Sequence, residues 1–427
     1  MEIQQARENG TEDWERVRLK EICRVESGGN APQGEEYFKD GKHPFVRVQH
    51  FDGTRNYVDR WDLINDKAVK DYRLKPFPRG SIVFPKSGAS IRLEKRAMLP
   101  FDCFVVSHLA VLTPNRNRVD SEFLLYLLKT VKLASRSGGT TLPYLNLSNI
   151  EELLVLIPPL AEQRKIAFVL SKIQQAIEQQ DKIIEATKNL KRSLMQKLFT
   201  EGTRRKEQKE SELGLIPEDW QLLKLKDVCD LKNGINFTRE QKGNTGMLTV
   251  DVLNMYNEGL YVNLQNLYRV NKKIPDEYLL RKGDILFVRS SLKKEGVGWA
   301  CLFKDVNEPV TFCGFIIRAR LKSPNIFPEF LAYFLRSIIV REKLISSSGK
   351  VTITNVNQGM LGTLAIPIPP LHEQREIANT LSLIDKKIEI EERRKATLEQ
   401  LFKTTLNKLM TGEIRVKDLD LGVINVS

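Results

Sequence analysis

The chain has 427 residues, of which 41% are hydrophobic and 28% are charged, and its formal net charge is +13. This length exceeds that of an ordinary domain, so we expect two or three domains, and the positive charge suits a polyanionic partner. The sequence contains no apolar run of about 18 residues and starts with a polar segment, which argues against a membrane helix or a signal peptide and favours a cytoplasmic protein.

Residues 1–157 predict a globular α+β domain. Short alternating segments bounded by turn residues predict strands in FVRVQHF from Phe45, SIVFPKS from Ser81 and FVVSHLAVLTP from Phe104. An apolar helix is expected in SEFLLYLLKTV from Ser121. A Gly/Thr-rich loop, SGGTTLPYLN from Ser137, follows this helix before the domain ends.

Residues 158–204 predict one long helix. It follows Pro158 and Pro159, and proline near a helix start is tolerated because its missing N–H would have no partner there. The stretch from Arg164 to Phe199 contains neither Pro nor Gly. Uninterrupted helix of that length spans roughly 50 Å.

The second half repeats this order. A polar linker is expected at 205–212, a second globular domain at 213–367, and a second helix with a C-terminal tail at 368–427. The second domain predicts strands in ILFVRSS from Ile285 and TFCGFIIRARL from Thr311, and a helix in FPEFLAYFLRSII from Phe327.

The two halves are copies of one unit. With an offset of 211, residues 157–200 align with 368–411 without a gap and share 18 identities in 44 positions. Upstream, TEDWERVRLKEICRVESGG from Thr11 resembles PEDWQLLKLKDVCDLKNG from Pro217, and RGSIVFPKS from Arg79 resembles KGDILFVRS from Lys282. The sequences between these repeated segments diverge, which favours two modules that perform the same kind of task on two different targets.

The two long helices carry heptad seams. Six of nine a and d positions are apolar in each helix, starting from Leu170 in the first and Leu381 in the second. Such helices gain little stability alone and should pack together or on partner helices. An antiparallel pair would place the domains at opposite ends of a rod; the alternative is that each helix docks on its own domain.

Catalytic and metal-binding motifs are absent from the sequence. It has no GxxxxGK[ST], no GxGxxG after a strand, no GxSxG and no Asn-Pro-Pro-aromatic motif. The five cysteines form no CxxC pair and the four histidines lack ligand spacing. We therefore expect a protein that recognises a target, with no catalytic residues, no metal and no cofactor of its own.

The duplicated PPL-x-EQR-x-I-A with its helix, together with PEDW and KGDIL, resembles the specificity subunits of type I restriction–modification enzymes. The resemblance covers nearly the whole chain and its order. It implies an α+β fold of two target-recognition domains separated by two long antiparallel α-helices, a coiled-coil spacer, with an internal pseudo-two-fold repeat. The first half departs slightly, with TEDW for PEDW and RGSIV for KGDIL.

The resemblance also implies a division of labour. Each domain would read one half of a bipartite, asymmetric site in double-stranded DNA, and the helices would set the gap. The helices would dock two modification subunits, which bind S-adenosylmethionine and methylate adenine, and restriction (translocase/nuclease) subunits would join them. This chain would be a non-catalytic subunit without a membrane partner.

Candidate contact residues lie where the shared frame meets the variable loops. Basic and polar side chains there suit phosphates and base edges. The candidates for DNA binding are Arg47, Gln49, Lys86, Ser87, Arg92, Arg136, Thr140, Arg289, Ser290, Lys293, Lys294, Lys350 and Thr352. The candidates for partner binding are Glu162, Gln163, Arg164, Glu373, Gln374 and Arg375, which are alternatively caps and braces of their own helices.

Other functions are compatible with parts of this pattern. A stand-alone DNA-binding regulator would need no partner subunits, but the apolar seams of the two long helices favour packing against other helices. A coiled-coil scaffold without DNA does not explain the positively charged domains. A specificity subunit of a related two-component restriction system would have nearly the same sequence pattern.

Overall fold

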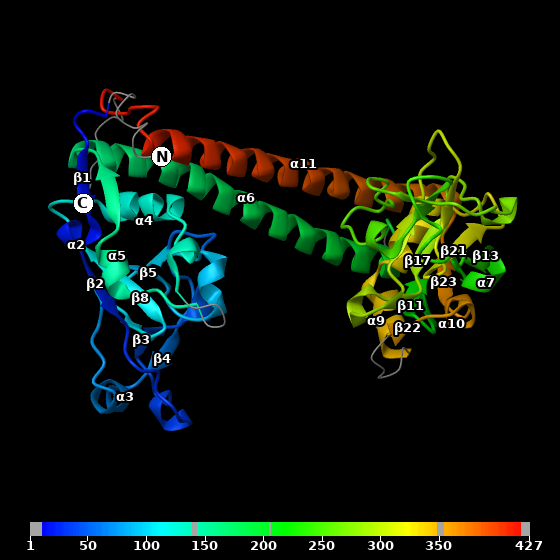
Figure 1. Ribbon diagram of the computed structural model, residues 1–427. Coiled ribbons are helices and arrows are strands. Elements are labelled where there is room, and N and C mark those ends of the chain that lie inside the picture. The colour runs from blue at the N-terminus through cyan, green and yellow to red at the C-terminus, as the bar shows by residue number, and fades with distance from the viewer. Residues whose placement is uncertain (1–10, 139–142, 205, 348–353, 420–427) are drawn as a thin grey trace. The chain divides into compact units, whose positions relative to one another are not determined.

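The computed structural model describes residues 11–138, 143–204, 206–347 and 354–419. The chain forms two compact units, and each is built from two separate stretches. The first unit comprises Met1–Asp181 with Arg394–Ser427, and the second comprises Lys182–Arg393. Each unit therefore combines one globular domain with one half of each long helix (Figure 1).

The first domain contains two small sheets. One is antiparallel, in the order β2 (Cys23–Ser27), β8 (Leu109–Pro114), β5 (Ile82–Pro85), β6 (Ala97–Met98). The other has the order β4 (Asp62–Ile64), β3 (His43–Val46), β7 (Phe104–Val105), with β3 and β7 parallel. The predicted α+β architecture is confirmed.

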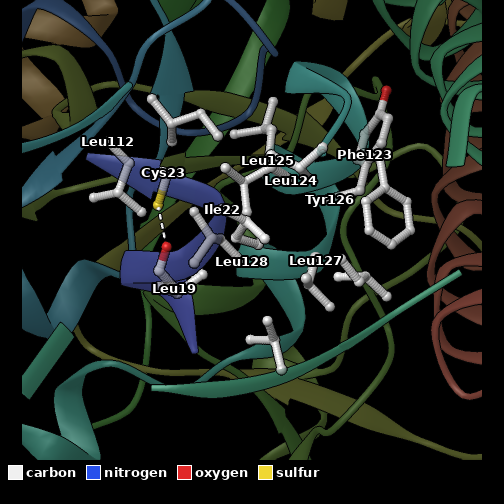
Figure 2. Close-up of a cluster of buried hydrophobic side chains, with 14 of the residues drawn as sticks. Leu19, Ile22, Cys23, Leu112, Phe123, Leu124, Leu125, Tyr126, Leu127 and Leu128 are labelled. Atoms are coloured by element: carbon white, nitrogen blue, oxygen red, sulfur yellow. Dashed lines mark hydrogen bonds between the residues drawn. The ribbon is translucent and has the colours of Figure 1, made fainter. Parts of the chain in front are cut away.

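Strand alternation divides the core of this domain into two layers. Ile82 and Phe84 of β5 face one hydrophobic cluster, whereas Val83 between them faces the other, as the two-residue period of a strand requires. Helix α4 (Ser121–Thr130) covers the first face, and its N-terminus is capped because the Asp120 side chain accepts a hydrogen bond from Phe123 N–H. Figure 2 shows the α4 side chains packed with Leu19, Ile22 and Leu112.

The second domain repeats this plan. Its first sheet has the order β13 (Cys229–Asn233), β21 (Ile316–Leu321), β17 (Ile285–Val288), β19 (Ala300–Leu302), and its second has the order β14 (Lys242–Gly243), β16 (Tyr268–Val270), β15 (Met247–Val250), β20 (Val310–Phe312). Ile285 and Phe287 face one cluster, and Leu286 and Val288 face the other. Helix α8 (Pro328–Leu335) takes the place of α4.

A two-stranded ribbon closes each domain. In the first, β1 (Glu15–Arg18) pairs antiparallel with β9 (Leu154–Ile157), and short helices α2 (Leu19–Ile22) and α5 (Leu147–Glu151) lie beside it. In the second, β12 (Gln221–Lys224) pairs with β23 (Ala365–Ile368), next to α7 (Leu225–Val228) and α10 (Gln358–Gly362). The ribbon places the start of each domain beside the Pro-Pro pair, Pro158–Pro159 or Pro369–Pro370, that precedes a long helix.

The long helices are α6 (Leu160–Glu201) and α11 (Leu371–Met410). In the second unit Lys191 Nζ lies 2.5 Å from Asp385 and Lys188 Nζ lies 2.9 Å from Glu392, so the helices run antiparallel there. In the first unit Lys395 of α11 lies 2.6 Å from Asp181 of α6. The predicted pairing of the two helices is confirmed.

The structure also departs from the sequence-based expectations in detail. The strand expected over FVRVQHF ends at Val46, and Val48–His50 form a 3-10 turn. The segment expected as a linker contains β10 (Gln208–Ser211), which pairs with β11 (Gly214–Pro217). The polar sequence of β10 agrees with its place at the protein surface, because its side chains are mostly exposed. The helix expected from Phe327 is followed by a separate one, α9 (Ile338–Ser347).

Candidate nucleic-acid interface

Several loops of the first domain meet at one end of its antiparallel sheet. The Oγ atom of Ser87, two residues after β5, lies 2.7 Å from Nδ1 of His108. Lys86 places its Nζ 5.4 Å from the centre of the Tyr144 ring. We call Lys86, Ser87, His108 and Tyr144 the first loop cluster; the sequence predicted the first two and missed His108 and Tyr144.

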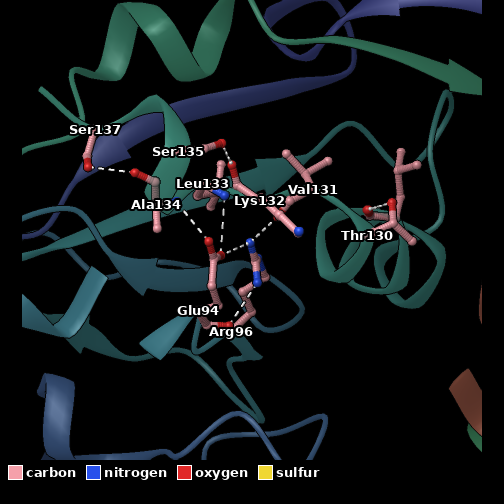
Figure 3. Close-up of polar contacts among 10 residues, drawn as sticks. Glu94, Arg96, Thr130, Val131, Lys132, Leu133, Ala134, Ser135 and Ser137 are labelled. Carbon is pink, nitrogen blue, oxygen red and sulfur yellow. Dashed lines mark hydrogen bonds and ion pairs between the residues drawn. The ribbon is translucent and has the colours of Figure 1, made fainter. Parts of the chain in front are cut away.

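Arg92 and Arg136 lie exposed on two short 3-10 segments, Ala89–Leu93 and Ala134–Arg136, that are tied to each other. Glu94 accepts hydrogen bonds from Ala134 N–H at 2.7 Å and from Arg96, whose guanidinium also donates to Val131 O at 2.5 Å (Figure 3). Because Glu94 and the buried Arg96 connect both segments, they hold both exposed arginines at defined places on the domain surface.

Arg47 is largely occupied within the domain. Its Nε donates to Asp62 at 2.6 Å, and its guanidinium lies 5.4 Å from the Phe45 ring centre. Gln49, two residues later, has an exposed side chain. Of this pair, only Gln49 presents its polar side-chain atoms without such internal ties.

The second domain has an equivalent loop cluster. Backbone bonds join Arg289 N–H to Phe315 O at 2.8 Å and Val356 N–H to Arg289 O at 2.9 Å. The Ser290 hydroxyl donates to Asn355 Oδ1 at 2.5 Å, within the short ribbon of β18 (Ser290–Ser291) and β22 (Thr354–Asn355). Lys293 follows with an exposed side chain.

The loops of the two domains share several equivalent hydrogen bonds. Arg47 N–H donates to His50 Nδ1 at 3.0 Å, and Asp251 N–H donates to Asn254 Oδ1 at 2.9 Å, so Gln49 corresponds to Leu253. Two further backbone bonds match: Lys86 N–H to His108 O in the first domain and Arg289 N–H to Phe315 O in the second. His108 therefore corresponds to Phe315.

The second cluster borders an open groove with a volume of about 910 Å³. Leu253, Leu292 and Phe315 line it with 82%, 85% and 60% of their surfaces exposed. Trp299 also lines it, under the buried Arg336 guanidinium at 4.4 Å. We call Leu253, Leu292 and Phe315 the apolar triplet. The sequence-based candidates for DNA contact are basic or polar residues, so they do not include these three.

Two buried arginines support the loops around this groove. Arg336 donates to Gly259 O at 2.7 Å and to Ala300 O at 2.6 Å. Arg341 donates to Val297 O at 2.5 Å and to Glu295 O at 2.6 Å. Burial lowers the pKa of the Arg341 guanidinium, and nearby Arg336 lowers it further. Arg336 directly follows α8 and Arg341 lies in α9, so both arginines connect the groove loops to the helical part of the domain.

Some candidates lie outside the described residues. These are Thr140, Lys350 and Thr352, and the side chain of Lys294. For them the DNA contact stays a prediction from sequence alone.

Gln163 and Gln374, predicted as partner-binding, satisfy their amides inside their own domains. Gln163 accepts from Asp120 N–H at 2.9 Å and donates to Pro158 O and Arg118 O. Gln374 makes the same three bonds with Phe327 N–H, Pro369 O and Asn325 O. Each glutamine thus fastens the start of a long helix to the cap of α4 or α8.

Glu162 and Glu373 are also buried, with 3% and 1% of their side chains exposed. Glu162 accepts from Arg415 at 2.7 and 2.8 Å. Glu373 accepts from Lys206 at 2.9 Å and from Trp220 Nε1 at 3.1 Å. Each carboxylate therefore holds the segment that follows the other long helix, which is an internal role.

Arg164 and Arg375, the last residues of the two EQR phrases, are exposed. Of the six residues predicted to bind partners, these two offer free surface. Partner binding by all six stays a prediction, and the structure gives the four buried ones a bracing role.

The cysteines have no sign of reactivity. All five are buried and free, and burial raises the pKa of Cys23 and of Cys229 to about 12. The described part of the chain contains no group of three or more His, Cys, Asp or Glu side chains placed to hold a metal ion. In the same residues, every helix is too short or too polar to cross a membrane.

The comparisons with known proteins agree with this duplicated architecture. Residues 11–188 and 217–400 each match the sequence profile of the type I restriction modification DNA specificity domain. The chain is 28% identical to the type I restriction enzyme MjaVIII specificity subunit of Methanocaldococcus jannaschii, covering 96% of this chain and 95% of that protein. It is 30% identical to the putative MjaX specificity subunit of the same organism, covering 95% of each.

Solved structures support the fold. The type I restriction–modification S subunit from M. genitalium matches with a TM-score of 0.56 and 16% identity, over 93% of this chain and 96% of that one. A chain from a study of complex assembly and conformational transition in the type I R-M system matches with a TM-score of 0.58 and 18% identity, over 94% and 99%.

The chain belongs to the family of type I restriction–modification DNA specificity subunits. It is the non-catalytic, DNA-recognising component of such a system, with two DNA specificity domains.

Proposed function

We propose that the chain reads a bipartite, asymmetric DNA site, with one half assigned to each globular domain. The observation that carries this proposal is the pair of loop clusters, which share backbone hydrogen bonds but differ in side chains, as with His108 and Phe315. A common frame explains a common docking mode on the duplex. Different side chains on that frame explain two different half-sites, because side chains at base edges determine sequence preference.

We propose that the paired helices set the unspecified gap between the half-sites. Helix α6 has 42 residues, which corresponds to roughly 60 Å of helix. The seam residues Leu170, Ile177, Leu381 and Ile388 are buried, which supports a stiff pair. A fixed spacing matters because half-sites about one helical turn apart lie on the same face of DNA.

We propose that two modification subunits dock on surfaces that the two repeats have in common, and that restriction subunits join this complex in the cytoplasm. Packing explains why a residue that is buried in both repeats is identical in both. A residue that is exposed and identical in both repeats is instead a candidate for contact with a partner subunit. Leu190 and Leu401 correspond in the repeat alignment and have 53% and 49% of their surfaces exposed. Two equivalent exposed sites suit two copies of one partner. In the alignment of the two helices, the identical pairs that are exposed in both copies are Arg164/Arg375 and Leu190/Leu401.

The direct test of recognition is methylome sequencing of cells that contain the cognate modification subunit, with and without this chain. We expect methylated adenines in a two-part motif with a fixed gap only when the chain is present. A contiguous palindromic motif, or no motif, contradicts the proposal. Removing whole turns from the paired helices should change the gap and leave both half-sites intact.

The docking surface is tested with the double variant Leu190→Glu and Leu401→Glu. The matched control is Leu383→Glu, which places the same charge on an α11 residue that is 65% exposed but corresponds to Lys172 in the other repeat. We expect the double variant to fold and to lose assembly with the modification subunit in size-exclusion chromatography, while the control assembles. Equal loss in both variants would contradict a docking role specific to the repeated leucines.

A further inference from the structure

We propose that the second domain reads thymine in its half-site through apolar contact between the apolar triplet, Leu253, Leu292 and Phe315, and thymine 5-methyl groups in the major groove. This inference rests on the proposed function of bipartite DNA reading. It adds the chemistry by which one of the two domains selects its bases.

The first support is the exposure of the triplet. Leu253, Leu292 and Phe315 come from three different loops and line one groove, although 82%, 85% and 60% of their surfaces are exposed. Large apolar side chains that gather on one exposed site without helping the core are typical of a binding surface.

The second support is the comparison with the first domain. The position of Leu253 is held there by Gln49 and the position of Phe315 by His108, while the surrounding backbone hydrogen bonds are the same. In the sequence alignment of the two strand-loop segments, Leu292 stands opposite Ala89. The frame therefore folds without these apolar residues, so folding alone does not explain them.

The third support is the charge around the groove. Residues 213–367 carry 21 basic and 15 acidic groups. Three acidic residues, Asp251, Glu258 and Glu295, line the groove together with Lys293, and Arg289 lies beside it between β17 and β18. Carboxylates repel phosphates but accept hydrogen bonds from cytosine amino groups. Base edges thus suit the acidic part of the groove, and phosphates suit Lys293 and Arg289.

Thymine is the base that fits this chemistry. In the major groove each base pair presents donors and acceptors, and the thymine methyl is the apolar group among them. Contact between that methyl and a leucine or phenylalanine side chain removes apolar surface from water. Burying one methyl group changes an equilibrium by about fourfold.

The test uses the full chain with its modification subunit and the duplex identified by methylome sequencing. Deoxyuridine replaces thymidine in one half-site at a time, which removes only the methyl groups. We expect binding by fluorescence anisotropy to weaken about fourfold for each contacted methyl in the half-site of the second domain. The same replacement in the other half-site should change affinity less than about twofold, since one methyl contact is worth about fourfold.

Variants assign the effect to the triplet. Leu253→Gln places the first domain's side chain in the second domain, and it should weaken binding to thymidine DNA and remove most of the loss caused by deoxyuridine. Leu215→Gln is the matched control, because Leu215 is 52% exposed but lies in β11 and does not line the groove. The control should behave as wild type on both duplexes.

Three outcomes would overturn the inference. They are unchanged affinity for deoxyuridine in the second half-site, a second half-site without an A·T pair, and a Leu253→Gln variant that loses the modification subunit instead of DNA. In the last case the groove is a protein-docking surface. Failure of the proposed function is distinct, because it appears earlier as the absence of any bipartite motif.

Discussion

The two repeats of this chain are alike where each domain joins its helix and unlike where each presents loops. Gln163 and Gln374 make the same three hydrogen bonds in their respective domains. The loops instead carry His108 in one domain and Phe315 in the other. The difference teaches that the junction is constrained by buried polar groups that need partners, whereas the loops are free to change with the target.

Even the junctions differ in one respect. Trp220 Nε1 donates to Glu373, whereas Trp14 Nε1 is buried and has no hydrogen-bond partner among the described residues. Arg415 lies 5.6 Å from the Trp14 ring and binds Glu162. The carboxylate thus accepts hydrogen bonds from a cation and a backbone N–H in both units, and from an indole N–H as well in the second.

The largest expected effect comes from removing these carboxylates. Breaking a buried ion pair by removing one partner costs about 3–5 kcal/mol, and the low end applies here because the cations keep a second partner. Arg415 keeps Asp13 at 2.8 Å, and Lys206 keeps Asp219 at 2.6 Å. We expect Glu162→Ala to cost about 3 kcal/mol and Glu373→Ala about 1 kcal/mol more, because the Trp220 N–H also loses its acceptor.

Denaturant unfolding with hydrogen exchange checks this prediction. Exchange should rise in the first unit for Glu162→Ala and in the second unit for Glu373→Ala. Equal stability of both variants and wild type would show that the two carboxylates are not braces.

A smaller effect is expected for the two tryptophans. Trp220→Phe removes a donor to a buried carboxylate and should cost about 1–2 kcal/mol. Trp14→Phe removes an N–H without an acceptor, and should leave stability within about 1 kcal/mol of wild type. Thermal unfolding of the two matched variants distinguishes them, and a larger cost for Trp14→Phe would contradict the difference between the junctions.

The smallest effect is a pH dependence of the second unit. Burial raises the pKa of Glu373, but hydrogen bonds from Thr203 N–H, Lys206 and Trp220 outweigh it, so the pKa is lowered from its ordinary value of 4.5. The stability that this carboxylate contributes is present above pH 4.5 and is lost as the pH falls through the lowered pKa. Glu373→Gln should therefore lose less stability than wild type between pH 5 and pH 3. A steeper loss in the variant would contradict the sign.

Much of the architecture follows from sequence because it depends on local patterns. The strands from Ile82 and Ile285 and the helix from Ser121 are confirmed, since two-residue and helical periods are visible without knowing the partners. Gly80 and Gly283, which stand opposite each other in the two repeats, both have positive φ, 85° and 89°, a conformation that glycine adopts without strain. The repeated tryptophans, Trp14 and Trp220, are both buried in the cores of their domains.

The candidate site depended more on tertiary structure. Sequence reasoning selected polar and basic residues such as Ser290, and it did not select Leu253 and Phe315, which lie beside Ser290 in the second domain. An isolated leucine in a loop gives no signal until the fold shows that it is exposed beside other apolar residues. The correspondence of Gln49 with Leu253 could not be recognised from sequence, because the segments between the repeated motifs have diverged.

The sequence by itself determined the duplication, the α+β domains, the paired helices and the family, because identity and periodicity are properties of the chain. Only the tertiary structure decided what Glu162, Gln163, Glu373 and Gln374 do. These polar residues begin helices, where exposure is the ordinary state, and their burial arises from contacts with segments far along the chain. A buried polar group must find a partner, and its partner is fixed by the fold.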